Sequence, residues 1–173
     1  MSASNPQSWL DIAEDDLASA RKLAAPPDPR WKTAVYHCQQ AAEKATKALL
    51  VQHDGMLLKK LERHDIGLLV EHLGQYQASM DDLKVRAEAL SDFATMYRYP
   101  GAEVEPLTQE VVDKAIDDAN FFVRRAKELL MLASMDASMK VCPLCKKDPC
   151  KCGGDGGGED NQRARRSSTP GMS

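Results

Sequence analysis

The clearest pattern of apolar and polar residues lies between positions 31 and 50, where it has the 3.6-residue period of an α-helix. One stripe of this helix is apolar and consists of Trp31, Val35, Cys38, Ala42, Ala45 and Leu49. A second stripe is polar and consists of Gln40, Glu43, Lys44 and Lys47. A third row of small residues, made of Ala34, Ala41 and Ala48, would let a neighbouring helix approach closely.

The polar stripe therefore has two interpretations. In the first, it lies at the edge of a contact with another helix, away from bulk water. In the second, Glu43 and Lys47 form an ordinary solvated pair, because they are four residues apart in the favourable order.

Capping signals place the helices on either side of the first loop. The first helix is predicted over Ser8–Ala25, with Ser8 as its N-cap. Asp28 as N-cap and Pro29 in the first turn then begin the helix described above. We expect that helix to end near Gly55, because glycine readily adopts the left-handed conformation at a helix C-terminus.

Three further helices follow from the same periodicity. They are predicted at about Asp65–Leu73, Met80–Tyr97 and Thr108–Met135. Aromatic residues are only 5% of the chain while hydrophobic residues reach 43%, so that small and aliphatic side chains must fill the interior. The expected fold is all-α: an up-and-down helical bundle of four to five helices over residues 8–135.

Charge and hydropathy limit the function. No stretch approaches the roughly 20 apolar residues that span a bilayer, and the first residues do not resemble a secretory signal. We therefore expect a cytoplasmic protein that does not associate with a membrane. Of the 23 basic and 26 acidic residues, seven and five lie from Asp136 onward, which leaves a net charge of −5 on the rest. Any nucleotide or RNA contact there must depend on a local basic patch.

The composition changes after position 135. Residues 136–152 hold four cysteines, Cys142, Cys145, Cys150 and Cys152, which could bind one structural zinc ion. The alternative is a set of redox-active or unliganded thiols, because only one residue separates the last two cysteines. Residues 153–173 are rich in glycine, arginine and serine and are expected to form a flexible, disordered tail. Cys38, on the apolar stripe, is expected to fill the core.

Three features occur in a characteristic order: the helix segment Gln39–Leu50, the pair His64 and Asp65, and the break Arg98-Tyr99-Pro100 before a long last helix. In this order they resemble the HEPN family, the higher eukaryotes and prokaryotes nucleotide-binding domain, over about residues 8–132. The resemblance implies a four- or five-helix bundle that commonly forms a homodimer. It also implies a frequent nucleotidyltransferase partner in prokaryotic toxin-antitoxin pairs, and metal-independent ribonuclease activity in many members.

The chain departs from the pattern of the active members. Those carry an arginine, four to six residues and then a histidine, which handles the proton of the attacking 2'-hydroxyl while the arginine holds the phosphate. Arg98 stands in the matching place, but no histidine follows it, because the four histidines are His37, His53, His64 and His72. The resemblance thus leaves open whether the protein is an enzyme, and no catalytic residue is assigned.

The expected ligand-binding site is an anion site. Arg98 and Tyr99 would contact a nucleotide or RNA, and the polar stripe of Gln40, Glu43, Lys44 and Lys47 would supply further donors. The structural alternative is that Arg98 caps its own helix and pairs with Glu43. Similarly, His64 and Asp65 are either a helix start capped by Asp65 or an acid and base pair.

Three functional hypotheses follow. The first is a HEPN domain that binds a nucleotide, RNA or a nucleotidyltransferase partner. The second is a ribonuclease with a rearranged site. The third is a dimeric scaffold that uses the cysteine tail to bind another protein.

Overall fold

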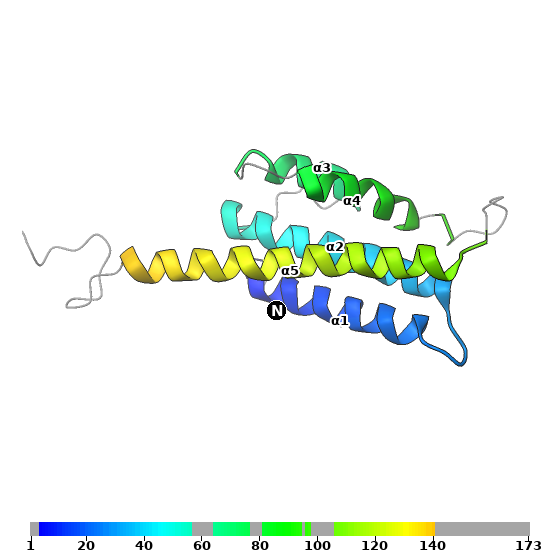
Figure 1. Ribbon diagram of the computed structural model, residues 1–173. Coiled ribbons are helices and arrows are strands. Elements are labelled where there is room, and N and C mark those ends of the chain that lie inside the picture. Colours follow the sequence, from blue (N-terminus) through cyan, green and yellow to red (C-terminus); the bar gives the residue numbers. More distant parts are fainter. Residues whose placement is uncertain (1–3, 57–63, 77–80, 95, 98–105, 141–173) are drawn as a thin grey trace, which may run out of the picture. The chain divides into compact units, whose positions relative to one another are not determined.

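The computed structural model describes the backbone of residues 4–56, 64–76, 81–94, 96–97 and 106–140. In this part of the chain all regular structure is helical, which confirms the all-α prediction (Figure 1). The elements are α1 (Pro6–Ala24), α2 (Trp31–Asp54), α3 (Ile66–Leu73), α4 (Asp81–Ser91), the 3₁₀-helix η2 (Asp92–Ala94) and α5 (Gln109–Lys140). The chain divides into two units, residues 1–133 and 134–173, and the sites described below lie in the first.

The first helix begins earlier than predicted. The cap is Asn5, whose side chain accepts a hydrogen bond from the backbone N–H of Gln7 at 3.0 Å, and Pro6 occupies the first turn. The prediction that Ser8 caps α1 was therefore wrong. Asparagine followed by proline is the stronger start signal, because it combines a capping oxygen with a φ already set for the helix.

The ends of α2 gave one wrong prediction and one correct one. Asp28 does not cap the helix; its carboxylate instead binds the guanidinium of Arg30 at 2.8 Å, and Arg30 precedes the first helical residue without a side-chain cap. Gly55 ends the helix as expected, with φ at +74° and its N–H donating to the carbonyl of Val51. The two helices α1 and α2 form an antiparallel hairpin (Figure 1).

The remaining helices match their predicted positions with shifts at their ends. Asp65 caps α3 and accepts from the N–H of Leu68 at 3.1 Å, as predicted. The fourth helix ends at Ser91 and tightens into η2, earlier than predicted, in the way that many helices end. The last helix begins directly after Thr108, as expected, and continues to Lys140, five residues beyond the predicted end.

The core is centred on α2, which contacts α1, α3, α4 and η2. All residues of the predicted apolar stripe are buried except Trp31, which is half-buried, and the row Ala34, Ala41 and Ala48 is fully buried as well. The buried apolar rows of α2 lie on more than one side of the helix. Its polar residues between positions 39 and 47 therefore have little access to water. Within the described residues, no helix combines the length and hydropathy needed to cross a membrane.

Candidate functional site: a polar network on the central helix

The central turns of α2 hold a buried ion pair. The Lys47 ammonium lies 2.7 Å from Glu43 Oε1, and the two side chains are only 6% and 3% exposed. The amide of Gln39, also buried, donates to Glu43 Oε2 at 3.0 Å. The interpretation of Glu43 and Lys47 as a solvated surface pair was therefore wrong, because the pair lies inside the bundle.

An imidazole joins this ion pair from the segment that precedes α3. His64 Nδ1 lies 3.2 Å from both carboxylate oxygens of Glu43, and Gln39 Nε2 donates to the His64 backbone carbonyl at 3.1 Å. The His64 side chain is 74% exposed, whereas the Glu43 carboxylate is enclosed. A neutral imidazole that donates from Nδ1 to a carboxylate keeps Nε2 as a proton acceptor, so this pair has the chemistry of a general base.

A second group of polar side chains connects α2 to α1. The Lys44 ammonium donates to Asp16 Oδ2 and also to Gln40 Oε1, the latter at 3.1 Å. His37 Nδ1 lies 2.8 Å from the other oxygen of Asp16. Gln40 also donates to Gln39 Oε1 at 2.7 Å, which links this group to the buried ion pair. We call the whole set the α2 polar network: Asp16, His37, Gln39, Gln40, Glu43, Lys44, Lys47 and His64.

The network brings together the four residues of the predicted polar stripe, but with a balanced charge. Each lysine faces its own carboxylate, Lys44 with Asp16 and Lys47 with Glu43. A ligand anion near these lysines would thus meet a carboxylate beside each ammonium. Additional positive charge is needed for an anion site, and the sequence offers Arg98 for it.

Arg98 and Tyr99 lie outside the described residues, as does the predicted contact between Arg98 and Glu43. The segment that leads to Arg98 is nevertheless tied to the bundle: η2 contacts α2, and the rings of Phe93 and Tyr97 lie 6.2 Å apart while packing against the core. The zinc site predicted at Cys142, Cys145, Cys150 and Cys152 also lies outside the described residues.

Sequence reasoning did not place four members of the network in the ligand-binding site. For His64 it offered an acid and base pair with Asp65 as an alternative, but Asp65 caps α3 and the imidazole faces Glu43. Gln39 had a usable signal, since it stands four residues before Glu43 and so shares its face of the helix. Asp16, His37 and His64 gave no signal of these contacts, because the contacts join segments 21 to 28 residues apart in the chain. Cys38, by contrast, was predicted correctly as a core residue, and its burial raises the pKa of the thiol to about 12.

The fold and the network define a class: an all-helical bundle whose central helix carries a buried polar cluster. The HEPN domain profile matches residues 6–129, so the chain belongs to the HEPN domain family. No curated protein matches significantly.

Two solved structures are similar. TT1696 from Thermus thermophilus is 25% identical with a TM-score of 0.62, and the match covers 71% of this chain and 96% of that one. ST0689, described as an archaeal HEPN homologue, is 28% identical with a TM-score of 0.57, and the match covers 72% and 97%.

Proposed function

We propose that this HEPN chain binds the phosphate of a nucleotide or of RNA through Arg98 together with donors of the α2 polar network. The observation that supports the proposal is the burial of Glu43, Lys47 and Gln39 in the middle of the core. Removing two charges from water costs several kcal/mol per ion, and apolar side chains of similar size would usually serve folding as well. Buried charges that stability does not require are typical of functional sites.

The partner and assembly form a second part of the proposal. The homodimer, the nucleotidyltransferase partner of a toxin-antitoxin pair and a zinc ion on the tail cysteines all follow from the family resemblance or from the tail motif. Light scattering on the purified chain tests the homodimer, and elemental analysis tests for the zinc ion.

Arg98→Ala tests the binding site. We expect it to weaken binding of a mononucleotide or a short RNA by on the order of 1.5–3 kcal/mol, the usual contribution of a hydrogen bond to a charged group. Titration by fluorescence anisotropy measures the affinity, and thermal melts of the same variant measure stability, which should hardly change. Arg30→Ala is the matched control, because Arg30 is exposed and pairs only with Asp28 among its described contacts. A variant that loses stability and keeps its affinity would show that Arg98 is structural.

One observation favours ribonuclease activity as a second candidate function. The exposed imidazole of His64, held by the buried carboxylate of Glu43, is a candidate for the general base that the sequence pattern after Arg98 lacks. In such a reaction Nε2 would take the 2'-hydroxyl proton while the 2'-oxygen attacks the neighbouring phosphorus. The bond to the 5'-oxygen would break, and that oxygen would take a proton from water, which leaves a 2',3'-cyclic phosphate and a 5'-hydroxyl.

His64→Ala tests this second candidate. If the natural chain cleaves RNA, the variant should do so roughly 10²–10⁴ times more slowly, which is the usual contribution of a positioned base. Gel analysis of an end-labelled RNA, with identification of the cyclic phosphate, measures the rate. His53→Ala is the control, since His53 lies on an exposed turn of α2 and stacks on Tyr76 instead of facing Glu43. RNA that stays intact with the natural chain would remove this candidate and leave binding.

A further inference from the structure

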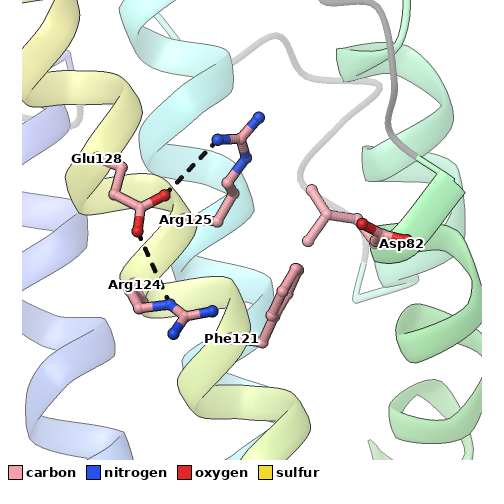
Figure 2. Close-up of a pocket in the computed structure, with 6 residues that line it drawn as sticks. Asp82, Phe121, Arg124, Arg125 and Glu128 are labelled. Atoms are coloured by element: carbon pink, nitrogen blue, oxygen red, sulfur yellow. Dashed lines mark ion pairs between the residues drawn. The ribbon is translucent and has the colours of Figure 1, made fainter.

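A cavity of about 320 Å³ lies between α4 and α5, separate from the α2 polar network (Figure 2). It is lined by Asp82, Leu83, Phe121, Arg124, Arg125 and Glu128. Its volume falls at the lower end of the range of small-molecule sites, about 300–1,000 Å³, so a ligand of modest size would fill it.

The α5 wall of the cavity carries two guanidinium groups. Arg124 and Arg125 both face Glu128, at 3.8 Å and 3.6 Å from its carboxylate oxygens. These separations exceed the 2.7–2.9 Å of a charge-assisted hydrogen bond, so Glu128 holds the two arginines only loosely. A ligand carboxylate could therefore be bound by both guanidinium groups without breaking a close ion pair, while the Arg124 guanidinium keeps its position 5.5 Å from the centroid of the Phe121 ring.

The opposite wall differs in charge, and an apolar surface separates the two. Asp82 lies on α4, across the cavity from the arginines, and the Phe121 ring lies between them (Figure 2). The ring is held in place before any ligand enters: the Arg86 guanidinium lies 4.3 Å from its centroid and is itself bound to the buried carboxylate of Asp118. The cavity thus offers a cationic wall, an acidic wall and a fixed aromatic surface.

We propose that this cavity binds a zwitterionic amino acid with an aromatic or large apolar side chain. The ligand carboxylate would bind Arg124 and Arg125, its ammonium would bind Asp82, and its side chain would pack against Phe121. The charges of the lining sum to zero, which matches a ligand without net charge. A phosphate dianion carries more negative charge than a carboxylate and would be repelled more strongly by Asp82 and Glu128, which disfavours a nucleotide here.

Calorimetric titration of the full chain tests the proposal with L-phenylalanine and two analogues that each lack one charge, 3-phenylpropanoate and phenethylamine. We expect phenylalanine to bind, and each analogue to bind at least about tenfold more weakly, because a hydrogen bond to a charged group is lost. The double variant Arg124→Ala/Arg125→Ala should bind phenylalanine at least about tenfold more weakly than the natural chain does. Asp82→Asn should weaken the binding of phenylalanine but not that of 3-phenylpropanoate, since that analogue has no ammonium to lose its partner.

Arg30→Ala is again the control, and circular dichroism melts verify that each variant is folded. Three results would overturn the proposal: no saturation by phenylalanine at millimolar concentration, equal affinity for phenylalanine and 3-phenylpropanoate, or tighter binding of AMP that depends on Arg124 and Arg125. The ligand and the residues differ from those of the Arg98 site, so failure here would leave the proposed nucleotide or RNA binding intact.

Discussion

Glu43→Ala is expected to lower the free energy of unfolding by about 3–5 kcal/mol, the usual effect of removing one partner from a buried ion pair. The substitution leaves the Lys47 ammonium, only 6% exposed, without its carboxylate. It also removes one of the two acceptors of the buried Gln39 amide and the partner of the His64 ring. Urea denaturation followed by circular dichroism measures the loss.

A double variant separates the charge effect from the effect of packing. In Glu43→Leu/Lys47→Met both charges are replaced by apolar side chains, and such replacements in other proteins are neutral or stabilising. We expect the double variant to have a free energy of unfolding about 1–3 kcal/mol below that of the natural chain, because the Gln39 amide keeps the His64 carbonyl but lacks the second of its two acceptors. It should thus be more stable than Glu43→Ala alone. If Glu43→Ala lowered the free energy of unfolding less than the double variant does, that result would contradict the burial of the pair.

Phe122→Ala should lower the free energy of unfolding by about 3–5 kcal/mol, because apolar burial is lost and the missing ring leaves a cavity. Phe122 is among the largest fully enclosed side chains of the bundle, at 2% exposure. Its sequence neighbour provides the control: Phe121 is half-buried at the α4–α5 cavity, so Phe121→Ala should cost clearly less. Thermal and urea unfolding of the two variants measure the difference. Equal losses would mean that the two faces of α5 are not buried as described.

The sequence predicted the helices well because their periodicity and many of their end signals are local. The apolar stripe of α2, the cap at Asp65 and the stop at Gly55 each depend on residues within one or two turns of the helix. The predictions of Ser8 and Asp28 as caps also used local signals, but they were wrong. Several residues near those helix starts could cap, and the choice among them depends on the backbone path into the helix.

Local sequence signals could not decide whether the polar stripe of α2 is buried or exposed to water. Helical periodicity shows which residues share a face, but it does not show how many faces of that helix are covered. The row Ala34, Ala41 and Ala48 was the signal that α2 is central, since small residues permit close approach. Contacts such as those of His64 with Glu43, and the cavity between Asp82 and Phe121, join distant segments and require the folded chain.

The enclosed thiol of Cys38 provides a built-in reporter of opening. A thiol whose pKa is near 12 is almost entirely protonated at neutral pH, and only the thiolate reacts rapidly with disulfide reagents. Cys38 lies on α2, against the core, so a reagent can reach it only when the helices around it separate. In a chain with serine at the other four cysteine positions, the labelling rate would therefore measure how often the bundle opens under native conditions, without any denaturant.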